Sequence, residues 1–471
     1  MKIEKLLNDN IEQMETGEEE NKLFLKKRKK YILKGLSSLL SSIIYLFGCY
    51  SLWTVGNSIV YLISFRRAYN PNLTFSHGYF LIPIMNFTLA LTSPVGGIIE
   101  DKIGGKKTIF LSTSILCISF TFMYFSRNIY IDYILMSLNG FGLAVGINIT
   151  RKNVCSFFIN RKALVCGIIN LIPGILCGGL NIFNEKYILN PLSENPTIEN
   201  IYYDQKIFLN FQKLIIFEIE LLIVICVLSL ILYFQNDPKE TIKFGFGEKF
   251  EQKKKEIKKS QINENQKVSN QIKFKKALFN IRAFKLFLMI FSFFPLINFI
   301  NNAWWPIGIY YKINIYYLQL IGALYNLAGC ISSIVFALIG DKIQFKILFI
   351  LFSTILTIIS FIFPLSFQNS IFYIFEVMTI SFIYNGYNII IDPHMMKIYG
   401  MDNYIKIGGV IRSSEGICEI LSIIFAFYLE NNFYGDKNNV YKLMYIISGC
   451  LSLMSLVLGL SEGEDKFHYE L

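Results

Sequence analysis

Charged residues and histidine are scarce in this sequence. Only 17% of the 471 residues are charged and three are histidine, whereas 53% are apolar. The apolar residues form repeated runs of about 20, the length that an α-helix needs to cross a ~30 Å hydrocarbon layer. This composition excludes a soluble enzyme, a secreted disulfide-stabilised domain and a nucleic-acid-binding protein. It favours an integral membrane protein.

Signatures of pumps and membrane enzymes are also missing. The phosphate-binding pattern GxxxxGK[ST] is absent, which argues against a pump driven by ATP. The histidines do not cluster, as a catalytic or metal centre inside the membrane would require. The nine cysteines lie mostly inside apolar runs, without a CxxC or a Cys/His group. We therefore expect no enzyme activity, no metal, no cofactor and no disulfide framework.

The apolar runs predict twelve membrane-spanning helices, so the expected fold class is an all-α integral membrane protein. The predicted spans are 35–65, 76–99, 108–126, 129–151, 163–184, 212–234, 283–309, 317–339, 347–366, 370–392, 405–429 and 441–461.

Basic residues indicate the orientation of these spans. Five consecutive cations, Lys26 to Lys30, precede the first span. Lysine and arginine collect on the cytoplasmic side of membranes, and the loops on that side of the predicted topology hold more of them than the opposite loops. The net charge of +11 is therefore attributed to topology and to contact with the lipid bilayer, not to a nucleic-acid partner. We expect a monomeric multi-pass protein of the plasma membrane, or of an organelle membrane, with both termini in the cytoplasm.

A polar segment divides the spans into two sets of six. It is rich in Lys, Glu, Gln and Asn and has no apolar face, which is typical of an unfolded cytoplasmic linker. The expected division is an N-terminal tail at 1–34, a six-helix bundle at 35–234, the linker at 235–282, a second six-helix bundle at 283–461 and a C-terminal tail at 462–471.

A short motif recurs after the second and the eighth span. The sequence DKIGGK at 101–106 returns as DKIQFK at 341–346, about half the chain later. This repeat predicts two pseudo-symmetric bundles with a substrate site between them. Glycine allows a tight turn, and aspartate can cap a helix or pair with a cation, in a contact that forms in one conformation and breaks in another. The predicted conformational latch comprises Gly97, Asp101, Lys102, Gly104, Lys106, Asp341 and Lys342.

The segment from Gly97 to Lys106 resembles the loop motif of the major facilitator superfamily. In that motif a glycine is followed by an aspartate four residues on, by a second glycine three residues further, and then by a basic residue. The resemblance implies the fold of that superfamily, with two pseudo-symmetric six-helix bundles that transport a substrate by alternating access.

A narrower resemblance is to the oxalate/formate antiporter and monocarboxylate carrier branch. The end of the first span carries Gly56-Asn57, Tyr61 and Arg66, and the segment FFINRKA at 157–163 is similar to a branch motif from which proline and glycine are missing here. This resemblance implies a small organic anion as the substrate, such as pantothenate, formate or oxalate, or a lactate-like monocarboxylate.

Three ionisable residues lie inside the eleventh span. A charge there costs at least ~2.5 kcal/mol and therefore indicates a function. The spacing of Arg412, Glu415 and Glu419 places them on one helical face. Arg412 either binds a substrate carboxylate through two hydrogen bonds or is neutralised by Glu415 as a structural pair. The branch resemblance implies a second cation on the eighth helix, and its absence from this eighth span favours a monocarboxylate.

Buried carboxylates are the candidates for proton coupling. We expect Glu376 in the tenth span and Glu419 in the eleventh to serve this role, while Glu218 in the sixth span either shares it or lines a hydrated outer vestibule. Asp132 and Asp392 lie at predicted span ends and are interpreted as helix caps.

Polar and aromatic side chains complete the predicted substrate site. Tyrosine and asparagine can hydrogen-bond hydroxyl or amide groups of a solute, and tryptophan either anchors the membrane edge or lines the cavity. Together with Arg412 and Glu415, the candidates are Tyr325, Asn326, Tyr384, Asn388 and Trp304.

The preferred interpretation is a secondary transporter that moves a small organic anion by alternating access, coupled to protons or to exchange. Three alternatives remain open. They are a carrier of a neutral solute such as a sugar or an amino acid, a transporter-like nutrient receptor, and a lipid scramblase-like protein.

Overall fold

The computed structural model consists of helices. In the part of the chain that it describes there is no β-strand. The described residues are 2–54, 59–73, 75–184, 205–237, 240, 280–313, 315–365, 369–432 and 437–462.

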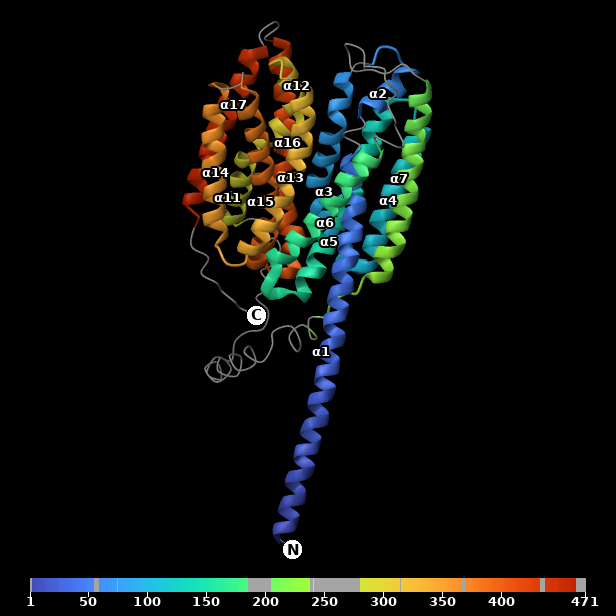
Figure 1. The fold of residues 1–471 in the computed structure, drawn as a ribbon, viewed down its shortest axis with the longest axis vertical. Coiled ribbons are helices and arrows are strands. Elements are labelled where there is room, and N and C mark those ends of the chain that lie inside the picture. Colours follow the sequence, from blue (N-terminus) through green and yellow to red (C-terminus); the bar gives the residue numbers. More distant parts are fainter. Residues whose placement is uncertain are drawn as a thin grey trace.

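The first half of the chain forms one bundle (Figure 1). Its helices are α1 (Lys2–Thr54), α2 (Ile59–Arg67), α3 (Leu81–Ile103), α4 (Gly105–Phe125), α5 (Ile129–Phe157), α6 (Lys162–Phe183) and α7 (Gln205–Leu232), with short 3-10 turns η2 (Phe75–Phe80) and η3 (Ile159–Arg161).

The second half forms a similar bundle. Its helices are α11 (Ile281–Phe293), α12 (Pro295–Tyr310), α13 (Ile315–Ile339), α14 (Phe345–Ile362), α15 (Ser370–Asn403), α16 (Gly409–Asn432) and α17 (Lys437–Leu460), with short segments η6 (Phe363–Leu365) and η7 (Tyr404–Gly408).

The expected all-α membrane-spanning fold class is confirmed. Ten helical segments in the described residues are long and apolar enough to cross a membrane. The remaining two predicted spans correspond to α13, which carries an apolar stretch at Leu324–Ile339, and to α16, whose four ionisable residues lower its hydropathy.

Two spans differ from the prediction in their continuity. The first span is described as α1 and α2, and residues 55–58 between them lie outside the described residues. The seventh is divided at Phe294, because Pro295 has no N–H to continue the hydrogen-bond ladder of the helix. The tenth was expected to end at 392 but extends to Asn403 with a kink at Gly400, whose φ of 74° suits glycine.

The turn between α3 and α4 explains one glycine of the repeated motif. Gly104 has a φ of 83°, and its N–H donates to the carbonyl of Glu100 at 2.8 Å. A side chain at this φ would strain the backbone. The glycine therefore allows two membrane spans to follow each other with a single residue between them.

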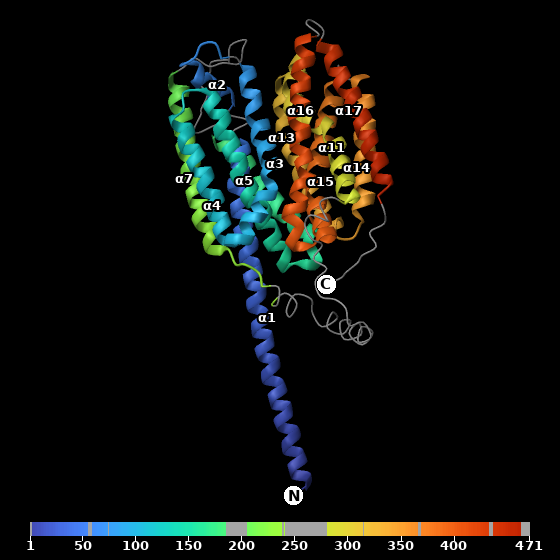
Figure 2. The ribbon, with the colours of Figure 1, turned by 180° about the vertical axis from the view of Figure 1, so that it is seen from behind.

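The two bundles lie side by side (Figures 1 and 2). They meet where α3 packs on α16 and where α6 packs on α13. These helices approach closely, because a Cβ added to Gly416 would lie 2.5 Å from the Cβ of Ala90, and one added to Gly340 would lie 3.0 Å from the Cβ of Ala163. Small residues thus bring the backbones of the two halves together, as in other membrane bundles.

α1 leaves the bundles and projects well beyond them (Figure 1). We call the end from which it projects the basal end, which includes the turns at Gly104, Phe158, Asp341 and Gly400, and the opposite end the distal end. The helix begins at Lys2, so the expected N-terminal tail at 1–34 continues the first span without a break from that residue on. Most of the expected linker, 235–282, and nearly all of the expected tail, 462–471, lie outside the described residues.

Candidate functional site

Asp101 joins the first half of the chain to the second at the basal end. The ammonium group of Lys406, in η7, donates to a carboxylate oxygen of Asp101. One turn earlier on α3, Gly97 packs against η7, and a Cβ added there would lie 3.0 Å from Cγ2 of Ile405. The structure therefore places Gly97 and Asp101 of the predicted latch at the interface between the bundles.

Asp341 makes the corresponding contact from the second half. Its carboxylate oxygens accept the backbone N–H groups of Ala163 at 2.9 Å and Leu164 at 3.2 Å. These amides begin α6, where the helix dipole also favours a negative charge. The two aspartates of the repeat thus each reach across to the other half, one near the start of α16 and the other at the start of α6.

The lysines of the repeat are placed differently. Lys102, Lys106 and Lys342 are exposed at the basal surface. Another ion pair, between Lys152 and Glu100 at 2.9 Å, lies within the first half. The aspartates, and not the lysines, are therefore the residues of this motif that contact the opposite bundle.

A further contact between the two bundles is buried more deeply. Arg151 of α5 donates from Nη1 to Oδ2 of Asp392 of α15 at 2.9 Å. Arg412 of α16 donates from its own Nη1 to Oδ1 of the same aspartate at 2.8 Å. Asp392 is only 1% exposed, so two guanidinium groups from opposite halves share one buried carboxylate.

Arg412 has further partners in its own half. Its Nε donates to Glu415 at 3.0 Å, and its Nη2 donates to the side-chain oxygen of Asn388 at 2.7 Å. Glu415 also accepts the hydroxyl proton of Tyr387 at 3.1 Å. Both explanations of Arg412 remain compatible with this geometry: it pairs with Glu415, and the pair reaches the interface between the halves.

Arg151 is held by residues of the first half. Its Nη2 donates to the side-chain oxygen of Asn170 of α6 at 3.1 Å, and that oxygen also accepts the hydroxyl proton of Tyr50 of α1 at 2.7 Å. Three helices of the first bundle thus position one guanidinium group toward the second bundle.

The formal charges of the four groups sum to zero, because the guanidinium groups of Arg151 and Arg412 are matched by the carboxylates of Asp392 and Glu415. Their accessibility differs: Arg412 is 14% and Glu415 20% exposed, whereas Asp392 is buried. A solute that enters between the halves would therefore meet the Arg412–Glu415 pair before Asp392. We call Arg151, Asp392, Arg412 and Glu415 the central charge cluster.

Glu419 lies farther along α16 and also reaches the first half. Its Oε1 accepts a hydrogen bond from Nδ2 of Asn86 of α3 at 3.0 Å. Tyr384 of α15 lies near Glu415, Glu419 and Tyr50. The predicted placement of Glu415 and Glu419 on the interface side of one helix thus agrees with their contacts.

The other predicted site residues are distributed more widely. The Tyr325 hydroxyl donates to the side-chain oxygen of Asn301 of α12 at 2.8 Å. Asn326 is exposed. Trp304 is partly buried against the core of the second half, and its backbone carbonyl accepts the hydroxyl proton of Tyr373. The hydrogen bonds of Tyr325 and Trp304 described here are made to Asn301 and Tyr373, outside the central charge cluster.

Two predicted carboxylates are buried inside single bundles. Glu376 is 2% exposed and lies beside Tyr373 and Tyr445 in the second half. Glu218 is 3% exposed in the first half and accepts a hydrogen bond from Asn184 at 3.2 Å. Neither lines a hydrated vestibule in this structure.

The interpretation of Asp132 and Asp392 as helix caps is wrong. Asn128, not Asp132, caps α5 by accepting the N–H of Tyr130. Asp132 instead pairs with Arg66 at 2.6 Å, with both side chains fully buried. Asp392 lies inside α15, because that helix continues eleven residues beyond the predicted boundary.

Sequence reasoning also missed Arg151 and Asn170. The predicted fourth span ends at residue 151, so this arginine is its last residue and was not singled out as a buried charge. A usable signal was present, because Arg151 and Asp392 are 241 residues apart and the repeated motif recurs after 240. Residues at equivalent positions of a pseudo-symmetric pair of bundles can meet near the symmetry axis.

The described residues contain no group of three or more His, Cys, Asp or Glu side chains placed to hold a metal ion. What the site offers a solute is hydrogen-bonding tyrosine and asparagine side chains and paired charges.

Comparison with known proteins gives a family match in part of the chain. The family model of the Major Facilitator Superfamily matches residues 221–423. A search of the curated proteins finds no match to this sequence.

Solved structures share the fold over nearly the whole chain. A proton:xylose symporter bound to 6-bromo-6-deoxy-D-glucose has a TM-score of 0.64 at 12% identity, over 91% of this chain and 94% of the symporter. The Escherichia coli fucose transporter in its outward conformation has a TM-score of 0.60 at 12% identity, over 89% and 99%. A human organic anion transporter has a TM-score of 0.56 at 9% identity, over 92% and 99%. The chain is therefore similar to the Major Facilitator Superfamily in sequence over residues 221–423 and shares its fold with these solved transporters over nearly its whole length.

Proposed function

We propose that this protein is a monomeric secondary transporter of the plasma membrane whose basal end faces the cytoplasm. The cations at 26–30 and the exposed lysines of the repeat lie toward this end, which supports the orientation. The ion pairs between the halves lie at or toward the same end, so the structure corresponds to a state closed to the cytoplasm. One chain supplies both sides of the central charge cluster, so the site needs no second copy.

The proposed substrate is a small organic monoanion that enters together with one proton. The observation that carries this proposal is the partly exposed Arg412–Glu415 pair at the interface. Protonation of Glu415 removes the charge that neutralises Arg412 from within its own helix. The guanidinium group is then available to hold a substrate carboxylate by charge-assisted hydrogen bonds.

Charge balance supports this coupling. The central charge cluster is formally neutral when empty. It is neutral again after one proton has bound to Glu415 and one monocarboxylate to Arg412. Neither the empty nor the loaded state then leaves a net charge in a region where desolvation makes such a charge costly. The proposal therefore predicts electroneutral symport.

The test is uptake of labelled lactate, formate and pantothenate into proteoliposomes that contain the purified protein. An acidic outside should stimulate uptake, because it supplies the coupled proton. Clamping the membrane potential to different values with valinomycin and potassium should leave the rate unchanged. Uptake that rises with a negative interior would contradict electroneutral symport. Binding without any flux would instead support a nutrient receptor.

A neutral hydroxylated solute is the second candidate. The observation in its favour is a set of polar groups on the second half, including the Tyr325–Asn301 hydrogen bond and Asn388. Two of the structurally similar transporters are described as symporters of xylose and fucose. Symport of a neutral sugar with a proton would carry net charge, so the same potential clamp separates this candidate from the first.

A further inference from the structure

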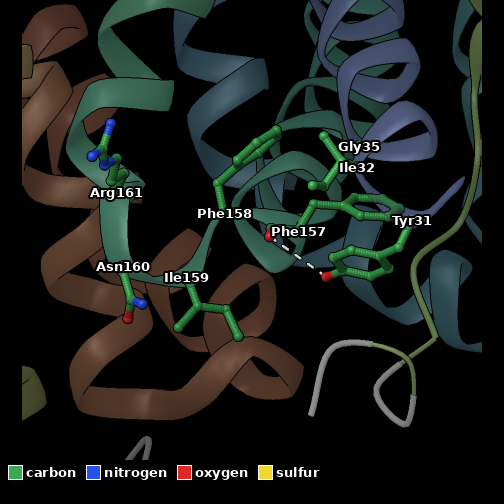
Figure 3. A pocket seen from close by; sticks show the side chains of 8 residues that line it. All are labelled: Tyr31, Ile32, Gly35, Phe157, Phe158, Ile159, Asn160 and Arg161. Atoms are coloured by element: carbon green, nitrogen blue, oxygen red, sulfur yellow. Dashed lines mark hydrogen bonds between the residues drawn. The ribbon is translucent and has the colours of Figure 1, made fainter. Parts of the chain in front are cut away.

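A pocket opens at the basal end between α1 and the turn that connects α5 to α6 (Figure 3). It has a volume of about 200 Å³. Three of its lining residues come from one turn of α1 and the others from the segment between α5 and α6. The lining residues are Tyr31, Ile32, Gly35, Phe157, Phe158, Ile159, Asn160 and Arg161.

The wall of this pocket is aromatic and apolar. The rings of Tyr31 and Phe157 lie 5.3 Å apart, and the tyrosine hydroxyl points to the carbonyl of Phe157 (Figure 3). Gly35 preserves the space, because a Cβ added there would lie 3.3 Å from the Phe157 side chain. Ile32 is 47% exposed. The pocket thus offers an apolar surface that is accessible from outside the bundle.

One cation lines the pocket, and two more lie on the same face of α1 as Tyr31. Arg161 is an exposed lining residue. Lys27 and Arg28 precede Tyr31 by four and three residues, so they lie on the same face of α1, and both are exposed. No aspartate or glutamate is among the lining residues. An occupant with a negative group next to an apolar chain would match this arrangement.

We propose that this pocket binds an anionic phospholipid of the cytoplasmic leaflet. This inference uses the orientation given under the proposed function. The phosphate is held by Arg161, Lys27 and Arg28, and the first part of an acyl chain lies against the aromatic wall. A lipid fits better than a soluble phosphate because the pocket lies beside the start of the first membrane span and most of its wall is apolar.

The pocket is also joined to the contacts between the bundles. Arg161 is followed within three residues by Ala163 and Leu164, whose N–H groups donate to Asp341 of the other half. A lipid that fixes the turn at 158–161 therefore stabilises the start of α6 in the position that Asp341 caps. Binding should favour the state closed to the cytoplasm.

Lipid binding can be measured directly by native mass spectrometry of the full chain after exchange into phosphatidylcholine with or without phosphatidylglycerol. The test variant is Lys27→Gln with Arg28→Gln and Arg161→Gln. The matched control is Lys26→Gln with Lys29→Gln and Lys30→Gln, which removes the same charge from other faces of α1. At about 1 kcal/mol per cation, the test variant should lose phosphatidylglycerol affinity on the order of a hundred-fold.

A second variant fills the pocket without changing charge. Ile32→Trp should weaken retention of phosphatidylglycerol while leaving the thermal stability close to that of the parent, because residue 32 is already half exposed. Equal losses in the test and control variants, or full retention by Ile32→Trp, would show that the lipid binds only to a diffuse basic surface and would overturn the proposal.

A soluble competitor distinguishes a lipid from a free phosphate. Glycerol phosphate added in phosphatidylcholine should not displace bound phosphatidylglycerol if the acyl chain contributes to binding. Displacement would assign the site to a free phosphate and refute the lipid proposal. Because these measurements record binding and not transport, they remain informative if the proposed substrate is wrong.

Discussion

At the scale of single residues, Asp392 has an unusual position. It is buried and receives a guanidinium group from each half of the molecule. Removing one partner of a buried ion pair is costly when it leaves the other charge without compensation. Either arginine can be lost while Asp392 keeps one cation. The loss of Asp392, in contrast, leaves Arg151 without a carboxylate, because Arg412 still pairs with Glu415.

This asymmetry gives the first prediction. Arg151→Gln should fold with a small loss of thermal stability, because Asp392 still pairs with Arg412. Asp392→Asn should be destabilised by several kcal/mol more, on the order of the 3–5 kcal/mol of a broken buried pair. Thermal unfolding of the two purified variants in one detergent measures the difference. Similar melting temperatures for the two variants would show that the shared carboxylate of Asp392 does not contribute more to stability than Arg151 does.

The second prediction concerns Arg412 and Glu415. Arg412→Ala should weaken anion binding by roughly ten- to a hundred-fold, since a charge-assisted hydrogen bond contributes about 1.5–3 kcal/mol. Arg412→Lys should weaken anion binding less, because lysine keeps the positive charge and loses only the two parallel hydrogen bonds of the guanidinium group. Saturation curves of labelled-anion uptake provide the affinities.

The double variant Arg412→Gln with Glu415→Gln separates the two explanations of the arginine. If Arg412 binds substrate, the double variant should recover stability relative to Arg412→Gln without recovering uptake. Recovery of both stability and uptake would mean that the arginine serves only to neutralise Glu415.

At the scale of elements, the starts of α6 and α16 are the places where each bundle is contacted by an aspartate of the other. The two contacts differ in strength. The Asp101 side chain is 50% exposed, so its ion pair with Lys406 contributes little, about 0.2–1 kcal/mol. Asp341 is less exposed and accepts two backbone N–H groups at a helix start, a cap of about 1 kcal/mol.

The third prediction follows from these magnitudes. Asp341→Asn and Asp101→Asn should each shift the population away from the state closed to the cytoplasm, by up to about fivefold for a change near 1 kcal/mol. The shift should be larger for Asp341→Asn. Distances between spin labels on the basal ends of the two bundles report the populations. Lys342→Gln serves as a control, because Lys342 follows Asp341 in the same turn and its side chain is exposed at the basal surface.

At the scale of the whole molecule, the contacts between the halves form a series along the interface. It runs from Asp101 and Asp341 at the basal surface, through the central charge cluster, to the hydrogen bond between Asn86 and Glu419. Opening the basal end requires these contacts to separate together, because each bundle has its own packed core and moves largely as a unit. A ligand that changes the charge balance in the middle of the series can therefore shift the whole equilibrium.

A buried ion pair inside the first bundle stabilises that bundle and does not connect the two halves. The Arg66 guanidinium pairs with Asp132 and also donates to the carbonyls of Met123 and Ser126 at the end of α4. All of these residues belong to the first half, so the pair need not break during transport. The resemblance that drew attention to Arg66 indicated its presence but not this partner.

The sequence by itself determined the all-α membrane fold class, the positions of its apolar helices and the repeat that contains Asp101 and Asp341. These features depend on local hydropathy and on the spacing of residues along the chain, which the ~30 Å hydrocarbon thickness and helix geometry translate directly into structure. The helical repeat also places Arg412, Glu415 and Glu419 on one face of their helix.

Only the tertiary structure decided which charges meet. Arg151 and Asp392 are 241 residues apart. Both lie at the ends of predicted spans, where the desolvation cost of a charge is small and a charge does not indicate a function. Their pairing exists because the two bundles dock along α3–α16 and α6–α13. The energy of a buried charge depends on its partner in space, and hydropathy along the chain contains no information about that partner.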